Sequence, residues 1–389
     1  MDSIKLASYI EHFWAESVIP TLSEFIRIPA KNTAFDAQWQ NNKHLEHAAN
    51  LVSNWINEQQ LPKAEVKVIT LKDKTPFLYA EIPGSLPIDK TIIFYGHLDK
   101  MPESEGWTEG YGPWKPVLEH DSLYGRGASD NGCSPFIAMA ALKALEQQSI
   151  PHARCVFLFE CGEENGSPDF SDYIEQLKEK IGNPDLIICL DSGGDDFERL
   201  WITNSIRGSI AANLSVAMLQ QAIHSGSFGG ITASTFRIIR QLLARIENAD
   251  TGELLLPELY VEIPAEHKEA LKTAAKAIGT DIIKNIPLLS GCAAISNDPE
   301  VLLHRQTWGS SLAVIGANGL PPIEQAGNVI RPFTTLKLNL RIPPVVNAEK
   351  VVIALKKTFE TDQPYGAKVS FVTTAKANGW VMPKMSWCY

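Results

Sequence analysis

The sequence has no excess of basic residues, and this lack excludes two large classes of binding protein. Its 389 residues include 35 Lys and Arg against 45 Asp and Glu, which gives a formal net charge of −10 at pH 7. Nucleic acids and anionic membranes are bound mainly through clustered positive charge. We therefore expect neither nucleic acid nor a membrane as a partner, while a small substrate remains possible.

Long apolar runs and paired cysteines are also lacking. No apolar run approaches the length of about 20 residues that a membrane-spanning helix needs, and the first residues lack the pattern of a signal peptide. The six cysteines show no disulfide or zinc-knuckle spacing. Cys155 and Cys189 fall inside apolar runs, where a buried thiol is expected. These absences predict a protein of the reducing cytoplasm.

The first half of the chain alternates between apolar runs and helical patterns. The composition, 44% apolar and 21% charged, is typical of a globular enzyme, and the length predicts two domains. Apolar runs at 91–95, 156–159 and 186–190 read as buried strands, and helices are expected over 134–147 and 172–181. This alternation predicts an α/β layer with a mostly parallel sheet.

The second half has a different order of elements. The expected elements are, in order, a strand at 210–218, a helix at 233–246, strands at 310–317 and 334–342, a helix at 348–359 and a strand at 368–374. This is the order of a split βαβ, ferredoxin-like α+β unit, into which a helix at 266–278 is inserted. A second domain of α+β type is therefore predicted.

Acidic residues and one histidine follow each expected strand of the first half, and one further aspartate precedes a helix. These residues are His97, Asp99, Glu163, Glu164, Asp191 and Asp130. Taken singly, each carboxylate could be a solvated side chain, and Asp130 could cap a helix. In a parallel sheet, however, ligands gather beyond the carboxyl ends of the strands. Four clusters at that one edge favour a metal site.

The residue types in these clusters suit a hydrolase with two metal ions. Such a pair acidifies a bound water and clamps the substrate carbonyl, and it needs a bridging carboxylate, further ligands and a free carboxylate as base. The candidate ligands are His97, Asp130, Glu164 and Asp191. Glu163 can act as the base, and Asp99 can orient His97 through its second ring nitrogen.

At several motifs the sequence resembles the M20 metallopeptidases, in particular the dipeptidase branch that includes carnosinase-like enzymes. The similar segments are 96–99, 106–116, 123–131, 162–167 and 190–192 in the first half, and 224–230 and 340–344 in the second. Their order and spacing extend over most of the chain. The resemblance implies zinc-dependent hydrolysis of peptide bonds in dipeptides or short peptides, with manganese or cobalt as possible substitutes.

The resemblance also implies a role for each site residue. Asp130 would bridge two zinc ions, with His97 and Asp191 completing one site and Glu164 serving the other. Glu163 would be the general base for a metal-bridged hydroxide, with Asp99 as the partner of His97. The peptide bond between Asp130 and Asn131 is expected to be cis. An aspartate at position 191 resembles dipeptidases more than deacylases of N-acyl amino acids, which are the alternative enzymatic reading.

The same resemblance assigns the domains. Residues 1–207 would form a catalytic domain, 208–378 a lid that makes a homodimer, and 379–389 the start of a return to the catalytic domain. His224 would reach the active site of the partner subunit and stabilise an oxyanion. Arg341 would pair with the substrate carboxylate, and Asn328 would line the same pocket. Without the resemblance, His224 and Arg341 read as ordinary surface residues.

One feature departs from the family pattern. The family has a fifth metal ligand, a histidine in a segment after the lid, but none of the nine histidines here follows His304. The similarity ends near residue 383. We therefore expect a catalytic domain that lacks its C-terminal part, with weak or absent activity and marginal stability. An inactive relic that serves only as a dimerising scaffold is the non-enzymatic alternative.

Overall fold

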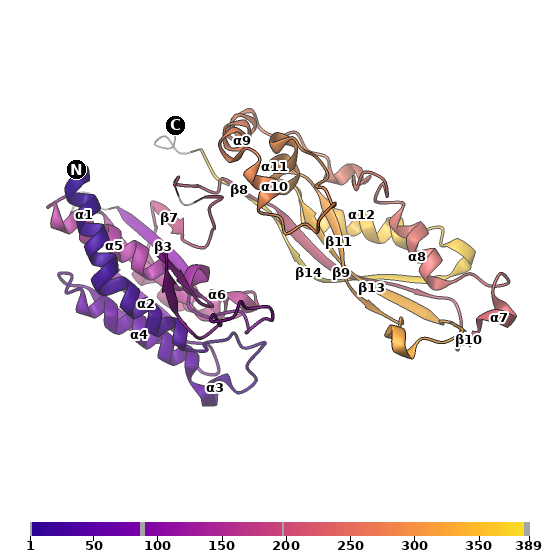
Figure 1. Cartoon of the computed structure of the whole chain (residues 1–389), viewed down its shortest axis with the longest axis horizontal. Coiled ribbons are helices and arrows are strands. Elements are labelled where there is room, and N and C mark those ends of the chain that lie inside the picture. The colour runs from indigo at the N-terminus through magenta and orange to yellow at the C-terminus, as the bar shows by residue number, and fades with distance from the viewer. Residues whose placement is uncertain (1, 86–89, 197, 385–389) are drawn as a thin grey trace. The chain divides into compact units, whose positions relative to one another are not determined.

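The computed structural model describes residues 2–85, 90–196 and 198–384 (Figure 1). The chain forms two compact units, Met1–Ser192 and Gly193–Tyr389. Residues 193–207, assigned from the sequence to the first domain, group with the second unit. Each unit has its own sheet and its own hydrophobic core.

A five-stranded sheet forms the centre of the first unit. The strand order is β1 (Glu65–Ile69), β2 (Phe77–Ile82), β6 (Arg154–Glu160), β3 (Thr91–His97) and β7 (Leu186–Cys189). β3 is parallel to both β6 and β7, whereas β1 and β2 form antiparallel pairs at one side of the sheet. The α/β class is confirmed. The sheet as a whole is mixed, and the three strands that lead into the acidic clusters are the parallel ones.

Helices cover both faces of this sheet. One face packs against α1 (Ser3–Phe13), α2 (Ile19–Arg27), α4 (His44–Glu58) and α5 (Ser134–Gln147), and the other against α6 (Phe170–Ile181). Because successive strand residues point to opposite faces, Phe94 joins the first core and Ile93 the second. A short helix, α3 (Trp39–Asn42), and a hairpin of β4 (Val117–Glu119) and β5 (Ser122–Tyr124) lie outside these layers.

β7 differs from the strand expected at 186–190. It lies at the edge of the described sheet, Ile187 is 60% exposed, and Cys189 is exposed. The predictions of a fully buried strand and a buried Cys189 thiol are therefore wrong, because β7 has a strand neighbour on one side only. Cys155 on the central strand β6 is buried, as predicted.

The second unit contains a four-stranded antiparallel sheet. Its strand order is β11 (Ser311–Asn318), β13 (Phe333–Ile342), β9 (Gly208–Ala217) and β14 (Lys368–Ala377). Two helices, α8 (Thr235–Leu243) and α12 (Ala348–Glu360), pack on one face of it. Along β9 every second residue is buried, from Gly208 to Val216, as the period of a strand with one covered face requires. This arrangement confirms the predicted ferredoxin-like order.

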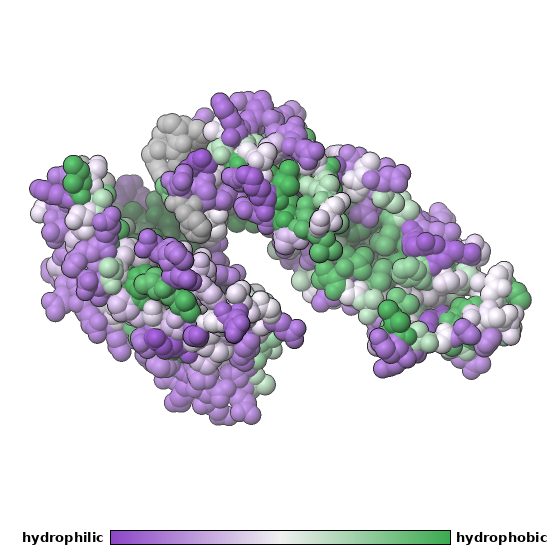
Figure 2. All heavy atoms as spheres, in the orientation of Figure 1, coloured by the Kyte–Doolittle hydropathy of each residue, from purple (hydrophilic) through white to green (hydrophobic). Residues whose placement is uncertain are grey.

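The remaining elements of the second unit are short or inserted. Helices α9 (Ala265–Ile278), α10 (Asp281–Lys284) and α11 (Pro299–Thr307) come between α8 and β11. The small strand pairs are β10 (Ile223–His224) with β12 (Val329–Ile330) and β8 (Ser205–Ile206) with β15 (Trp380–Val381), and α7 (Ser225–Phe228) follows β10. Figure 2 shows hydrophobic side chains on the surface of this unit, and Val314, Ile315 and Val372 are exposed on its strands. Within the described ranges, no helix combines the length and apolar character needed to cross a bilayer.

Candidate metal centre

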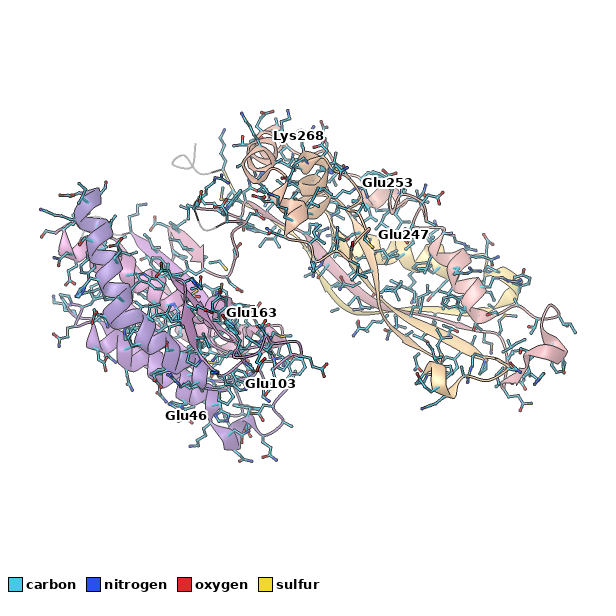
Figure 3. All side chains as sticks on the ribbon, in the orientation of Figure 1. Glu46, Glu103, Glu163, Glu247, Glu253 and Lys268 are labelled. Atoms are coloured by element: carbon cyan, nitrogen blue, oxygen red, sulfur yellow. The ribbon has the colours of Figure 1, made fainter. Side chains whose placement is uncertain are left out.

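The predicted cluster forms at one end of the first sheet. His97 is the last residue of β3, and Asp191 lies two residues beyond β7. Glu163 begins the turn η3 (Glu163–Asn165) after β6, and Asp130 lies in η2 (Ala128–Gly132), shortly before α5. Figure 3 shows Glu163 beside the strands of the first unit. The parallel strands thus bring together residues that lie far apart in the sequence.

The imidazole of His97 is the centre of the cluster. The side chain is buried, and its Nε2 atom lies 3.1 Å from Asp130 Oδ1, 3.7 Å from Asp191 Oδ1 and 3.9 Å from Glu163 Oε2. One ligand atom from each of His97, Asp130 and Asp191 lies within 4.8 Å of the other two. One imidazole nitrogen with two carboxylate oxygens is a donor set that suits zinc and similar divalent ions. The residues therefore fit a metal ion.

Asp99 supports two parts of this site. Its backbone oxygen lies 3.1 Å from Nδ1 of His97, and its carboxylate oxygen Oδ1 lies 3.4 Å from the same nitrogen. The carboxylate also accepts hydrogen bonds from the backbone N–H groups of Glu163 and Glu164, both at 3.1 Å. Asp99 therefore orients the imidazole mainly through its backbone and fixes the Glu163–Glu164 turn through its side chain. The second of these contacts was not expected from the sequence.

Asn131 is a supporting residue that the sequence analysis did not single out. Its side-chain Nδ2 donates to the Leu190 carbonyl at 2.6 Å and to Asp191 Oδ1 at 3.3 Å, while its Oδ1 accepts from the His97 N–H at 3.0 Å. The peptide bond between Asp130 and Asn131 is cis, as predicted. A Cβ atom on Gly96 would lie 2.4 Å from Asn131 Oδ1, so the glycine makes room for this contact. The sequence signal was the position of Asn131 directly after Asp130.

The charges around His97 explain the protonation of the cluster. Burial alone would lower the pKa of His97, but hydrogen bonds to Asp130, Asp191 and Asp99 raise it to about 12. The hydrogen bond to His97 lowers the pKa of Asp130. A cation among these carboxylates would take the place of the imidazole proton, because metal binding requires neutral histidine and ionised carboxylates.

The two glutamates of the η3 turn have the opposite shift. Burial raises the pKa of Glu163, His97 opposes this rise, and the negative charges of Asp191, Asp99 and Asp130 add to it. Burial and the negative charge of Asp130 raise the pKa of Glu164 to about 7. Glu164 is not in the three-ligand group.

The predicted residues of the second half lie in the second unit. His224 ends β10 and Asn328 directly precedes β12, where the Asn328 carbonyl accepts from the Ser225 N–H at 2.9 Å. Both side chains are exposed. Arg341 is exposed near the far end of β13, about 25 Å along the strand from its start by the rise per residue. The structure thus brings His224 and Asn328 together, and it places Arg341 apart from them.

Residues 93–378 match the family described as Peptidase family M20/M25/M40. The chain belongs to this family. The expectation drawn from the motifs is therefore confirmed at the family level.

Individual relatives of this M20-family chain are dipeptidases by name. The chain is 29% identical to human Beta-Ala-His dipeptidase over 312 residues, which is 78% of this chain and 59% of the relative. It is 22% identical to a Cysteinylglycine-S-conjugate dipeptidase of Corynebacterium striatum over 295 residues, 73% of this chain and 60% of the relative. The chain thus spans about three-fifths of the length of these curated relatives.

Solved structures agree on the fold. The crystal structure of human carnosine dipeptidase 1 matches with a TM-score of 0.68 and 23% identity, covering 97% of this chain and 81% of that chain. The di-peptidase Dug1p from Saccharomyces cerevisiae matches with a TM-score of 0.68 and 20% identity, covering 97% and 80%. At these identities the likeness concerns the fold.

Proposed function

We propose that the protein is a metal-dependent dipeptidase that hydrolyses the peptide bond of dipeptides or other short peptides. The observation that carries this proposal is the group of His97, Asp130 and Asp191, with one ligand atom of each within 4.8 Å of the others and a carboxylate oxygen of Glu163 at 3.9 Å from the His97 Nε2 atom. Membership of the M20 family supports it, as do the dipeptidase names of the relatives.

Two metal positions are proposed, of which the first has the complete group of three ligands. His97, Asp130 and Asp191 would hold one divalent ion, for which we propose zinc, and Asp130 and Glu164 would share in holding a second. When bound, such ions act as Lewis acids toward a carbonyl oxygen and lower the pKa of a coordinated water. Asp99 and Asn131 would keep the ligands oriented through their hydrogen bonds to His97 and Asp191.

Glu163 is proposed as the general base. Its carboxylate is half-buried with Oε2 at 3.9 Å from His97 Nε2, and its backbone N–H donates to Asp99. Burial raises its pKa, and a general base is most effective when its pKa is closer to the working pH than that of a free carboxylate. Glu163 would accept the proton of the attacking water and then donate it to the nitrogen of the departing amine.

The second unit is proposed as the lid and dimerisation domain that binds the substrate. Arg341 would bind the substrate carboxylate, because a guanidinium group can donate two parallel hydrogen bonds to it. His224, with Asn328 beside it, would donate to the developing oxyanion. The separation of His224 from Arg341 along β13 supports assigning His224 to the active site of the partner subunit in a homodimer.

We also propose a cytoplasmic location. The described cysteines Cys133, Cys155, Cys161, Cys189 and Cys292 are free thiols. Thiols stay reduced in the cytoplasm, whereas oxidising compartments favour disulfides.

The test is hydrolysis of a dipeptide panel by purified protein with added zinc or manganese. Glu163→Gln is expected to lower kcat by a factor of about 100 to 10,000, the usual contribution of a general base. Glu103→Gln is the matched control, since it makes the same change at an exposed carboxylate of the same unit (Figure 3). Activity that survives both Glu163→Gln and a chelator would contradict the proposal. Hydrolysis of N-acetyl amino acids in place of dipeptides would assign the deacylase alternative.

A further inference from the structure

A buried carboxylate outside the three-ligand group lies at the end of β6. Glu160 is the last residue of this strand, and 3% of its surface is exposed. Its backbone lies between two other strands, since it pairs with Phe77 of β2 and with His97 of β3. A buried carboxylate is unfavourable unless hydrogen bonds satisfy its oxygens. The donors to Glu160 therefore show which parts of the molecule it holds together.

Two hydroxyl groups donate to the same oxygen of Glu160. The Tyr95 hydroxyl lies 2.7 Å from Oε1 of Glu160, and Ser167 Oγ lies 2.8 Å from the same atom. Tyr95 belongs to β3 and therefore to the sheet, whereas Ser167 follows the η3 turn that begins with Glu163. The carboxylate of Glu160 thus connects the sheet to the turn that contains the proposed base.

Ser167 closes this turn onto Glu163. Its backbone N–H donates to the carbonyl of Gly162 at 2.9 Å, and the N–H of Gly166 donates to the carbonyl of Glu163 at 2.7 Å. The backbone is left-handed at both Gly166 and Ser167, with φ angles of 79° and 55°. A left-handed serine is uncommon, and this conformation persists only where neighbouring groups hold it. The hydrogen bond from the serine hydroxyl to Glu160 is such a restraint.

The η3 turn is therefore held by one carboxylate at each end. Asp99 accepts from the N–H groups of Glu163 and Glu164 at its start, and Glu160 accepts from the hydroxyl of Ser167 at its end. We propose that Glu160 is a positioning residue that acts through Ser167 and keeps the carboxylate of Glu163 in its place at the metal centre. The inference rests on the proposed peptidase function and adds to it a residue that acts on the base. A general base must lie within hydrogen-bond reach of the proton that it takes, so a small displacement of the turn lowers kcat.

The test begins with three variants of the zinc-loaded protein. Glu160→Met removes the acceptor oxygens and keeps a side chain of similar length. It should lower kcat for dipeptides by a factor of about 10 to 100, the size expected when a catalytic group moves by about 1 Å, with KM and zinc content unchanged. Ser167→Ala should lower kcat in the same way. Glu160→Gln should keep most of the activity, because one oxygen remains to accept from both hydroxyl groups and because burial already raises the pKa of Glu160.

Tyr95→Phe is the matched control for Ser167→Ala. Both changes remove one hydroxyl donor from the same oxygen of Glu160, but Tyr95→Phe leaves the contact with the turn intact. It should therefore lower kcat much less than Ser167→Ala does. In addition, Glu160→Met is combined with Glu163→Gln. Because the effect passes through Glu163, the double variant should retain the residual rate of Glu163→Gln.

A second measurement needs no turnover. Amide hydrogen exchange is followed by mass spectrometry on peptides that contain residues 162–167. Loss of the restraint should speed exchange of this turn in Glu160→Met and Ser167→Ala, and Glu160→Gln should exchange like the wild type. If Glu160→Met does not fold, Ser167→Ala carries both measurements, since it removes only one hydroxyl at a half-buried position.

Each outcome decides the inference. It is overturned if Ser167→Ala leaves kcat and exchange unchanged, or if Tyr95→Phe lowers kcat as much as Ser167→Ala does. It is also overturned if Glu160→Met lowers the residual rate of Glu163→Gln by the factor seen in the parent protein, as a general structural role would. A protein that hydrolyses no dipeptide would contradict the proposed function. Faster exchange in Ser167→Ala would then still support the restraint of the turn, and unchanged exchange would overturn it.

Discussion

Lys100 follows Asp99 and is completely buried without an acidic partner among the described residues. Its Nζ atom donates to the carbonyl oxygens of Phe25 at 2.6 Å and Ile28 at 2.9 Å, at the C-terminal end of α2. Its aliphatic chain lies against Gly127, where a Cβ atom would come within 2.8 Å of it. Lys100 thus joins the end of a helix to the segment that leads into the metal centre, and we predict that its titration controls the stability of the first unit.

The direction and size of this effect follow from the burial of the ammonium group. Burial lowers the pKa of Lys100 from 10.5 to about 7. Between these two values the unfolded chain binds a proton that the folded chain does not, so the free energy of unfolding rises with pH across this interval. The slope is at most about 1.4 kcal/mol per pH unit, and from pH 7 to pH 9 the rise is about 2 kcal/mol. The carbonyl hydrogen bonds favour the ammonium form and make this an upper limit.

Lys100→Met removes the titrating group and keeps the length of the side chain. The free energy of unfolding is measured in urea by tryptophan fluorescence. The difference between the wild type and Lys100→Met, wild type minus variant, should increase by about 2 kcal/mol from pH 7 to pH 9. Lys143→Met is the control, because Lys143 also donates to a carbonyl, that of Gln59, but is paired with Glu146. A difference between wild type and Lys100→Met that stays constant over this range would refute the reasoning.

Three further predictions concern the metal centre. Asp99→Asn replaces one acceptor oxygen by a donor, so one of its two bonds to the N–H groups of the η3 turn is lost; kcat for dipeptides should fall about 10-fold or more while zinc content, measured by mass spectrometry, changes little. Gly96→Ala would place a methyl group 2.4 Å from Asn131 Oδ1, and it should weaken zinc binding at least about 10-fold in equilibrium dialysis, since disturbed supporting residues typically cost this much; unchanged affinity would show that Asn131 can move freely. His97→Ala leaves the carboxylates of Asp130 and Asp191 to hold the ion of the three-ligand group. The zinc retained after gel filtration should therefore drop to a small fraction of the wild-type amount. Full retention would show that another group holds the metal.

The residues at the strand ends of the site could be predicted, because the carboxyl ends of parallel strands lie at the same edge of a sheet. His97 and Asp191 follow apolar runs that are easily recognised in the sequence. In the structure one ligand atom of each lies within 4.8 Å of the other. The burial of β7 could not be predicted. The apolar residues of a strand do not show whether it lies at the centre or at the edge of the sheet, and this position decides how much of the strand is buried. Ile187 is exposed for this reason.

Supporting contacts were less visible than ligands. Asn131 acts through bonds to the backbone of His97 and Leu190, residues 34 and 59 positions away, so its role depends on the assembled sheet. Nothing in the sequence marks Lys100 as buried, because its contacts with the helix carbonyls depend on how α2 packs.

The metal centre contains charges that remain unbalanced among the described residues. One imidazole faces the carboxylates of Asp130, Asp191 and Glu163, a set that a divalent cation would neutralise. Uncompensated like charges cost stability unless a ligand is gained in return. We therefore expect zinc to raise the melting temperature of the wild type. The increase should be much smaller in His97→Ala, and an undiminished increase in that variant would show that zinc stabilises the protein from another site.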